Sequence, residues 1–498
     1  MRSFTILVAL ACSSALWVTG AGPAAGSAAP ALARAGHQVA ELDRAKPRPG
    51  TKRVRPRVTR VAPASGPTAG GTRVVISGRN LARPTRVTVG GRTATVLAAR
   101  RNRIVIRTPE APTCVRTVAR VVVRTKAGAS RVTKRTRFTY AGRVARPAVA
   151  AGNRFSVALR RDGAVLAWGA GQYGVLGQGN EASSSGPVRV KGLGCIVAIT
   201  AGASHAAALT AGGQVWSWGA ATAGQAGDGR LGVRLLPSRA LLDVPVVQIS
   251  AAGDKTVART ADGSVLGWGW ETAKEFGGGR HMTKLPVRLT SLRQVRDVFA
   301  GASNVLVVRH DRTLWGLGAG PALGLDAAGS SALPRQVGSL GGVARVRVGL
   351  GSVNAVTADG SLWGWGVNDG EAGGALGLGF SGPPVRTPTT TSLTDVIDTA
   401  GISPQGLALR SDGTVWGWGA CTYCDPAGGA PGDGTRLAPT QVPGVSGAVG
   451  IATANGRFHA LHADGRVSVW GYGWVLPGGD YRQTVRSATL VPGLDLVP

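Results

Sequence analysis

From residue 145 onward, short apolar runs and tight turns recur about every fifty residues. Each copy has an apolar run, a turn pair and an outgoing stretch in which large and small residues alternate. Asp-Gly between two such runs is typical of a β-hairpin, because its second residue tolerates a positive φ. The pattern therefore predicts seven copies of one β-hairpin. Their turn pairs are Asp162-Gly163, Gly212-Gly213, Asp262-Gly263, Asp311-Arg312, Asp359-Gly360, Asp412-Gly413 and Asp464-Gly465.

The outgoing strand of each hairpin has one face of large residues and one face of small residues. The large residue six positions after the first turn residue is Trp168, Trp218, Trp268, Leu317, Trp365, Trp418 or Trp470. Sheets with such faces pack against one another, and radial packing gives a propeller. We predict a seven-bladed β-propeller over residues 145–498. Residues 490–498 are similar to the approach to the other blades, and we expect them to complete the first blade and remove its open edge.

The residues before the repeats divide into three segments. Residues 1–29 have the charged, apolar and small-residue order of a secretory signal peptide, with Arg2 before the apolar stretch from Phe4 to Trp17. Residues 30–55 lack apolar periodicity and are predicted to be a basic linker. Residues 56–141 alternate short β-branched runs with Gly, Pro and Asn, which predicts a compact antiparallel β-sandwich. We therefore expect an all-β protein without a transmembrane segment, secreted or held at the cell surface.

The charge of the chain is uneven. Its 498 residues include 57 Lys and Arg against 25 Asp and Glu, but residues 31–150 hold 28 of the basic residues and only three acidic ones. A basic surface here could hold the protein on an anionic cell-wall polymer or another anionic surface, without specific nucleic-acid recognition. Arg outnumbers Lys 49 to 8, so codon usage is the alternative explanation. The candidate residues are Arg53, Arg55, Arg57, Arg83, Arg86, Arg92, Arg100, Arg101 and Arg103.

Four cysteines follow the predicted signal peptide. Cys421 and Cys424 are predicted to form a small loop disulfide, because a zinc site would need further ligands at matching spacing. Cys114 and Cys195 could then link two domains, although the sequence does not fix the connectivity.

Sequence motifs of catalysis or cofactor binding are weak. Residues 169–174 match G-x-G-x-x-G, but dinucleotide binding needs this loop between a parallel strand and a helix, so we interpret it as a turn. His459 and His462 are three residues apart and are expected to be edge residues on opposite faces of a strand. We predict no enzyme activity, no cofactor and no metal.

Aromatic residues outside the repeat register give the better functional signal. They follow the glycine of their blade by a few residues, which predicts that they lie in equivalent loops at one end of the propeller. Exposed Tyr and Trp on a rigid rim are typical anchors of protein interfaces. The alternative is that each packs over its own loop. The candidates are Tyr173, Trp270, Tyr423, Tyr472 and Trp474, with Tyr481 nearby.

Two segments resemble known families. Residues 70–76 (GGTRVVI) and the closing 138–140 (FTY) are similar to the IPT/TIG immunoglobulin-like domain. Residues 202–209 (GASHAAAL) with 215–219 (VWSWG) resemble the repeat of the regulator of chromosome condensation family, a resemblance that implies a seven-bladed propeller. The histidine position of that repeat is occupied by histidine at His205. In other copies we assign the same position to Phe155, Thr256, Asn304 and Ser352.

The resemblance leaves two functional expectations open. In the family the best-known activity is guanine-nucleotide exchange on a nuclear GTPase, and a secreted bacterial relative inhibits β-lactamases. For a secreted bacterial chain we expect a non-catalytic binding or scaffold protein whose propeller loops contact a protein partner. The alternative is a regulatory protein that acts like an exchange factor or an enzyme inhibitor.

Overall fold

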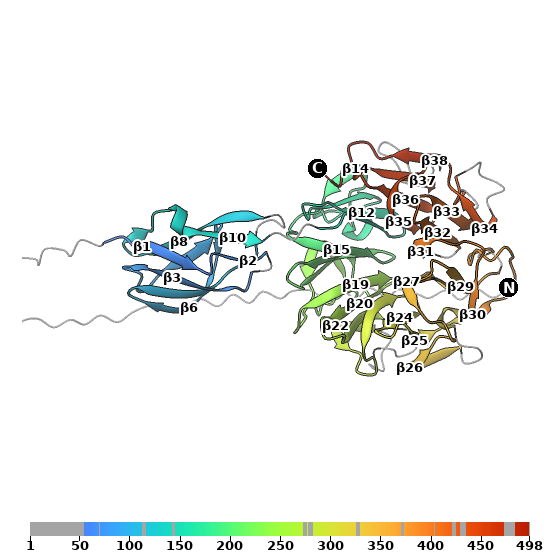
Figure 1. Ribbon diagram of the computed structural model, residues 1–498, viewed down its shortest axis with the longest axis horizontal. Coiled ribbons are helices and arrows are strands. Elements are labelled where there is room, and N and C mark those ends of the chain that lie inside the picture. The colour runs from blue at the N-terminus through green and yellow to red at the C-terminus, as the bar shows by residue number, and fades with distance from the viewer. Residues whose placement is uncertain are drawn as a thin grey trace, which may run out of the picture. The chain divides into compact units, whose positions relative to one another are not determined.

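The computed structural model describes residues 54–497, apart from residues 69, 112–115, 142–144, 272–275, 277–281, 325–328, 370–372, 403, 421–424, 429–434 and 473–483 (Figure 1). The predicted signal peptide and nearly all of the predicted linker lie outside the described residues. Where the chain is described, its regular elements are β-strands and three single-turn 3₁₀ helices, so the predicted all-β class is confirmed. The 3₁₀ helices are η1 (Lys134–Thr136), η2 (Gln172–Gly174) and η3 (Pro321–Leu323).

Two sheets form the N-terminal sandwich. One has the strand order β1 (Arg57–Ala62), β3 (Arg73–Arg79), β7 (Arg103–Arg107), β6 (Thr95–Arg100). The other has the order β2 (Ser65–Pro67), β10 (Arg137–Ala141), β8 (Thr117–Thr125), β4 (Arg86–Val89), β5 (Arg92–Thr93), with β9 (Gly128–Ala129) beside β8. Alternate residues of both sheets, such as Val74, Ile76, Val121 and Phe138, face the core and are fully buried.

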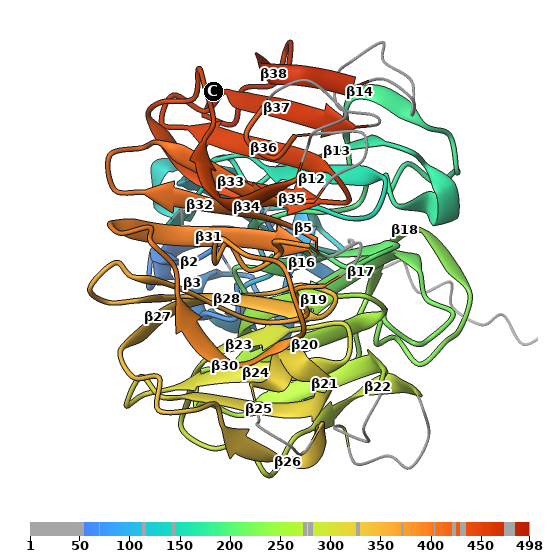
Figure 2. The same ribbon diagram turned by 90° about the vertical axis from the view of Figure 1, so that its right-hand side faces the viewer.

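Seven four-stranded antiparallel sheets follow, each made of consecutive strands (Figure 2). The innermost strands are β11 (Ala148–Ala151), β15 (Ile196–Ala201), β19 (Val246–Ala252), β23 (Val295–Ala300), β27 (Val343–Val348), β31 (Val396–Ile402) and β35 (Ala448–Ala454). The second strands are β12 (Phe155–Leu159), β16 (His205–Thr210), β20 (Lys255–Thr260), β24 (Asn304–Arg309), β28 (Ser352–Thr357), β32 (Gln405–Arg410) and β36 (Arg457–His462).

The outer half of each sheet has two more strands. The third strands are β13 (Val165–Gly169), β17 (Val215–Ala220), β21 (Val265–Trp270), β25 (Leu314–Ala319), β29 (Leu362–Gly366), β33 (Val415–Gly419) and β37 (Val467–Tyr472). The outermost strands are β14 (Ser184–Arg189), β18 (Val233–Arg239), β22 (Met282–Arg288), β26 (Ser330–Gln336), β30 (Val385–Thr390), β34 (Arg436–Gln441) and β38 (Thr484–Leu490).

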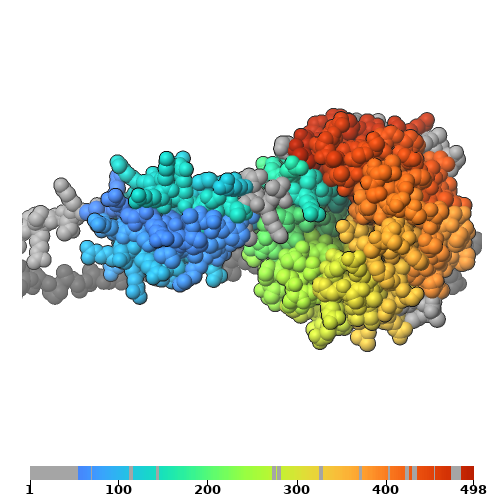
Figure 3. Space-filling model, in the orientation of Figure 1, coloured from blue at the N-terminus to red at the C-terminus, as the bar shows by residue number. Residues whose placement is uncertain are grey.

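The sheets form a closed ring of seven blades. Each innermost strand contacts the innermost strand of the next blade, and β35 contacts β11. Figures 1 and 2 both show blade 7 (red) beside blade 1 (green-blue), and in Figure 3 the blade surfaces follow one another in chain order from green to red. The second residue of every turn pair has a positive φ, including Arg312 at 64°. The predicted hairpins and the predicted propeller are therefore confirmed.

The expected way of closing the ring is wrong. Blade 1 builds all four strands from its own consecutive residues, and the C-terminal segment after β38 adds no strand to it. Instead, Arg161 donates its N–H to the carbonyl of Leu496 at 2.8 Å, the contact that Ala211 makes with Cys195 in blade 2. The C-terminal segment thus takes the place beside blade 1 that the segment ending at Cys195 takes beside blade 2, and its Leu494 and Leu496 are buried with Trp168.

Side-chain contacts hold the two end blades together. His459 Nε2 and Ser156 Oγ are 2.9 Å apart, and the guanidinium of Arg457 donates to the carbonyls of Gly152 and Phe155. His459 is buried in the middle of β36, so the expectation that it is an edge residue is wrong. The sequence pattern missed this role because it does not show which blade faces β36.

The large residues of the third strands connect neighbouring blades. Five of the six indoles donate from Nε1 to a buried backbone carbonyl of the preceding blade: Trp218 to Val175 (2.7 Å), Trp268 to Gln225 (2.9 Å), Trp365 to Ala322 (3.1 Å), Trp418 to Ala375 (3.0 Å) and Trp470 to Pro426 (3.0 Å). Trp168 is equally buried, but among the described residues its Nε1 has no hydrogen-bond partner. The tryptophans therefore fix the spacing of blades as well as filling the space between them.

The outermost strands are free sheet edges, and six of them carry proline at the same place. Proline stands two residues before the last strand residue and offers no N–H to an incoming strand. In β38 this place is taken by Ala488. The six prolines are Pro187, Pro237, Pro286, Pro334, Pro388 and Pro439.

Candidate functional site

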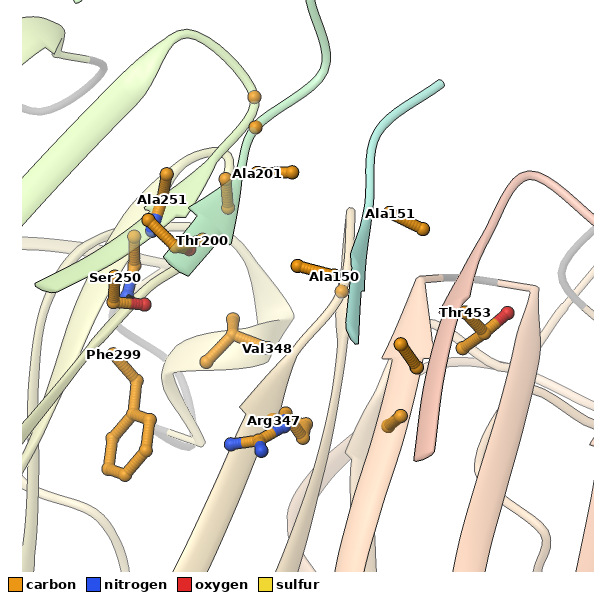
Figure 4. A pocket seen from close by; sticks show the side chains of 18 of the residues that line it. Ala150, Ala151, Thr200, Ala201, Ser250, Ala251, Phe299, Arg347, Val348 and Thr453 are labelled. Carbon is orange, nitrogen blue, oxygen red and sulfur yellow. Dashed lines mark hydrogen bonds between the residues drawn. The ribbon is translucent and has the colours of Figure 1, made fainter. Parts of the chain in front are cut away.

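The propeller encloses a cavity around its axis, about 270 Å³ in volume. Figure 4 shows side chains from the innermost strands of several blades around this space, with Arg347 and Phe299 among them. Most lining residues are small, and Arg347 is the one charged residue among them. The guanidinium of Arg347 lies 3.4 Å from Asp398 Oδ1 on the next innermost strand.

The polar side chains of this cavity bind the backbone of the neighbouring blade. Thr200 Oγ1 accepts from Ala251 N, and Ser250 Oγ accepts from Ala300 N, both at 3.0 Å. Gln248 accepts from Val298 N (3.1 Å) and donates to its carbonyl (3.2 Å). These groups are held by structural hydrogen bonds, so the cavity is a rigid support.

The cavity opens at the end of the propeller that carries the long loops. Its rim includes Asn153 and Leu350, in the turns between the first and second strands. Phe155 pairs with Gly169, so the loop after each third strand lies at this same end. We call it the loop end, and the opposite end, with the turn pairs, the Asp-Gly end.

The predicted aromatic residues are only partly brought together. Tyr173 in η2 is 46% exposed with φ at 59°, a backbone conformation that is rare for a bulky side chain. Trp270 is 44% exposed but is the last residue of β21 rather than a loop residue. Tyr472 has the same place at the end of β37 and packs against a buried cluster. Tyr423, Trp474 and Tyr481 lie outside the described residues.

Further apolar side chains are exposed at the loop end. Leu350 on the cavity rim is 58% exposed, and Phe380, in the loop between β29 and β30, is 47% exposed. The aromatic prediction missed Phe380 because it considered only residues close to the glycine that ends the third strand. An aromatic residue anywhere in that loop would have been the better signal. The loop end therefore exposes Tyr173, Trp270, Leu350 and Phe380 from blades 1, 3 and 5.

The buried polar residues of the second strands are not arranged as a reactive site. Burial lowers the pKa of His205 to about 4, and burial and the neighbouring Arg457 lower the pKa of His459 to about 3, so both imidazoles stay neutral at pH 7. His205 Nε2 lies 2.9 Å from Thr256 Oγ1 of the next blade. Among the described residues, no three His, Cys, Asp or Glu side chains are grouped as metal ligands.

One assignment within the repeat is wrong by a single residue. His205 pairs with Gly219 at the start of the second strand, and Lys255, not Thr256, pairs with the equivalent Gly269. The turns before β16 and β20 have the same length, because Ala201 pairs with Ala206 and Ala251 pairs with Thr256, but Gly253 stands one residue later in its turn than Gly202, so that alignment on the glycine is shifted by one. Lys255 is fully buried, with its ammonium nitrogen 5.5 Å from the ring centroid of Phe276.

The sandwich carries a strongly basic surface. Eight of the nine predicted arginines are described and exposed, and Arg53 lies outside the described residues. Residues 54–141 contain 20 Lys and Arg but a single acid, Glu110. Five pairs of arginines stand directly opposite each other on neighbouring strands: Arg57 and Arg79, Arg73 and Arg107, Arg100 and Arg103, Arg120 and Arg137, Arg86 and Arg124. Like charges in this register repel one another.

The predicted disulfides remain predictions. Cys195 is buried, and its Sγ lies 3.7 Å from the carbonyl oxygen of Ala111. Cys114, Cys421 and Cys424 lie outside the described residues. In the part of the chain that the structure describes, no helix is long and apolar enough to span a membrane.

Seven four-stranded sheets in a closed ring define the class of this protein, a β-propeller preceded by a β-sandwich. Family models agree with the propeller and with the sandwich. The IPT/TIG domain matches residues 56–140, and the regulator of chromosome condensation (RCC1) repeat matches residues 162–209 and, in a second form, residues 148–175 and 196–225. The chain therefore contains an IPT/TIG domain and, within the first two blades of its propeller, RCC1 repeats.

Two solved structures have a similar fold. One is Prp20p from Saccharomyces cerevisiae, described with its binding to Gsp1p and histones, at 20% identity and a TM-score of 0.59, covering 70% of this chain and 87% of that one. The other is yeast RCC1 (Prp20) bound to Kap60, at 20% identity and a TM-score of 0.58, covering 69% and 84%. At this identity the likeness shows the fold alone. No curated protein matches the chain.

Proposed function

We propose that this protein is a non-catalytic binding protein whose propeller contacts a protein partner through its loop end. The observation that carries the proposal is the exposure of Tyr173 and Trp270, each nearly half accessible, on a scaffold whose repeat tryptophans, such as Trp218 and Trp418, are buried between blades. Large, rigid side chains of this kind contribute much contact area at a low cost in conformational entropy. The positive φ of Tyr173 supports a role beyond packing.

The solved relatives support protein binding as the role of such a propeller. Prp20p is described with its binding to Gsp1p and histones, and yeast RCC1 with its complex with Kap60. A regulatory role, such as exchange-factor or inhibitor activity, would follow from the identity of the partner. The charged N-terminal start and apolar stretch favour secretion, so we propose that the partner is a secreted or cell-envelope protein.

The basic sandwich is proposed to attach the protein to an anionic polymer of the cell envelope. Codon usage explains the preference for Arg over Lys, but it does not explain why residues 54–141 hold one acid while residues 151–498 hold 22. The five opposed arginine pairs repel one another in the free protein, and a polyanion would relieve this repulsion.

Affinity capture with the mature protein, against its own envelope and secreted fractions, would identify the partner and test the proposal. Replacing Tyr173 and Trp270 together by Ala should weaken binding to the captured protein at least about tenfold, because both anchors are lost. The matched control replaces Val247 and Ile397, each 48% exposed at the Asp-Gly end, by Ala. Equal binding by the Tyr173/Trp270 variant and the wild type would overturn the proposed face.

Retention on isolated envelope at low and high salt tests the basic surface separately. We expect retention to decrease as the salt concentration rises, and to decrease at low salt when Arg120 and Arg137 are replaced by Ser. Replacing the exposed Arg335 and Arg345 of the propeller removes the same charge elsewhere and should change little. Retention that is insensitive to salt would contradict the electrostatic attachment.

A further inference from the structure

Blades 4 and 6 each cover a tryptophan with an arginine at the Asp-Gly end. Arg309 ends the second strand of blade 4, and its guanidinium carbon lies 3.5 Å from the ring centroid of Trp315. Arg410 has the same place in blade 6, 5.9 Å from the ring centroid of Trp416 and 3.4 Å from Asp412 of the turn pair. A guanidinium over an indole ring is attracted by the ring's electrons, and the aspartate adds an ion pair.

Blade 5 has the same tryptophan and aspartate but lacks the arginine. The register of the second and third strands shows which residues are equivalent, since Val308 pairs with Leu314, Val356 with Leu362 and Leu409 with Val415. The next residue along the second strand is arginine in blades 4 and 6 and Thr357 in blade 5. Thr357 accepts from Trp363 Nε1 at 3.1 Å and donates to Asp359 Oδ1 at 2.6 Å.

A hollow of about 500 Å³ lies beside these residues. Trp363, Asp359, Thr357, Leu340 and Pro388 are among its lining residues, and no Lys or Arg lines it. Asp359 is exposed, and among the described residues no ion pair holds its carboxylate, whereas the equivalent Asp412 of blade 6 pairs with Arg410. Hydrogen bonds from Thr357 and Ser361 lower the pKa of Asp359, so its carboxylate is ionised at neutral pH.

The other blades lack this combination. Blade 2 has Trp216 beside Thr210, but Gly212 stands in place of the aspartate. Blades 1, 3 and 7 have Leu166, Leu266 and Ser468 in place of the tryptophan. Among the seven blades, blade 5 alone therefore has both the tryptophan and the aspartate but no basic residue at the position of Arg309 and Arg410.

We propose that the hollow on blade 5 binds the guanidinium group of an arginine side chain of a protein partner, stacked on Trp363 and paired with Asp359. Blade 4 shows the same ring holding a guanidinium of this chain, and blade 6 shows the ring and the carboxylate holding one together. Arginine fits better than lysine because its planar group stacks on an indole ring while it pairs with a carboxylate. The site is at the Asp-Gly end, so it does not depend on the proposed binding at the loop end.

Binding of blocked Gly-Arg-Gly peptide to the full chain, followed by NMR titration of the peptide signals, tests this site. Thr357→Arg would fill the hollow with the arginine that blades 4 and 6 have, and it should weaken peptide binding at least about tenfold. Asp359→Asn, a change of an exposed side chain, should weaken it to a similar extent. Thr260→Arg adds the same charge at the equivalent position of blade 3 and should leave binding unchanged.

Two peptides of the same length test which chemistry is recognised. Blocked Gly-Cit-Gly, with the uncharged isostere citrulline, should bind at least about tenfold more weakly than the arginine peptide, and Gly-Lys-Gly should fall between them. The proposal would be overturned if the wild type did not bind the arginine peptide, or bound the citrulline peptide equally well. Undiminished binding by a folded Thr357→Arg or Asp359→Asn protein would overturn it as well.

Discussion

The indole hydrogen bonds between blades allow a direct comparison of two buried tryptophans. Trp218 and Trp168 have equivalent register positions in β17 and β13, and both are at most 1% exposed. Trp218 Nε1 donates to the Val175 carbonyl at 2.7 Å, whereas Trp168 Nε1 has no partner in the part of the chain that the structure describes. We predict that Trp218→Phe lowers the free energy of unfolding much more than Trp168→Phe.

The two substitutions remove the same ring atoms, so the cost of the lost volume is similar and largely cancels in the comparison. Trp218→Phe also leaves the buried Val175 carbonyl without its partner, which costs about 1–3 kcal/mol. Trp168→Phe removes a buried donor that was already unpaired, so this cost does not arise. The expected difference is therefore about 2 kcal/mol, or roughly 2 to 4 °C in the midpoint of thermal unfolding.

Denaturant unfolding followed by far-ultraviolet circular dichroism measures the difference without relying on tryptophan fluorescence. The slopes of the free energy against denaturant should agree between the two variants, so that the midpoints report stability. If Trp168→Phe were as destabilising as Trp218→Phe, the indole hydrogen bonds would contribute nothing to the contact between blades, and the reasoning would be refuted.

Two further predictions concern acid stability and a single glycine. His205 and His459 have pKa values lowered to about 4 and about 3, so between pH 6.5 and 4 only the unfolded chain takes up these protons, and stability should fall as the pH drops through this range. His459→Gln should flatten this loss in unfolding midpoints measured across the range, and an unchanged slope would contradict it. Gly269 has φ at 100°, and a Cβ there would lie 2.2 Å from the Asp254 carbonyl oxygen, so Gly269→Ala should cost several times more than Gly192→Ala, whose Cβ would meet nothing. Similar midpoints for the two alanine variants would show that the close approach relaxes without cost.

The fold was predictable because each hairpin is formed by residues that lie close together in the sequence. The turn pairs, the large residues six positions later and the spacing of about fifty residues all follow from each hairpin, so seven blades could be predicted without knowing any contact between them. One error is local: Lys255 was missed because Gly253 is displaced by one residue from the place of Gly202, although the turn itself has the same length. The other error lies where the answer depends on another segment, because the closure of the ring depends on β36 facing blade 1.

The candidate site was predictable only in part. The rule that an aromatic residue outside the repeat positions is exposed was correct for Tyr173 and Trp270. The same rule also selected Tyr472, which packs against the buried cluster of blades 6 and 7. Whether a loop side chain is exposed depends on the residues against which the loop packs. The position of the residue within the repeat does not give this information. The hollow of blade 5 was not predicted from the sequence. The absence of an arginine at Thr357 is informative only once the structure shows that Arg309 and Arg410 lie over their tryptophans.

The prolines of the outermost strands have a consequence for assembly in concentrated solution. A free sheet edge with available N–H groups can add a strand from another molecule, which is the first step of many aggregation reactions. In six blades proline removes one of these donors, and only β38, with Ala488, lacks this protection. Within the propeller, strand addition at an outermost strand would therefore begin at blade 7.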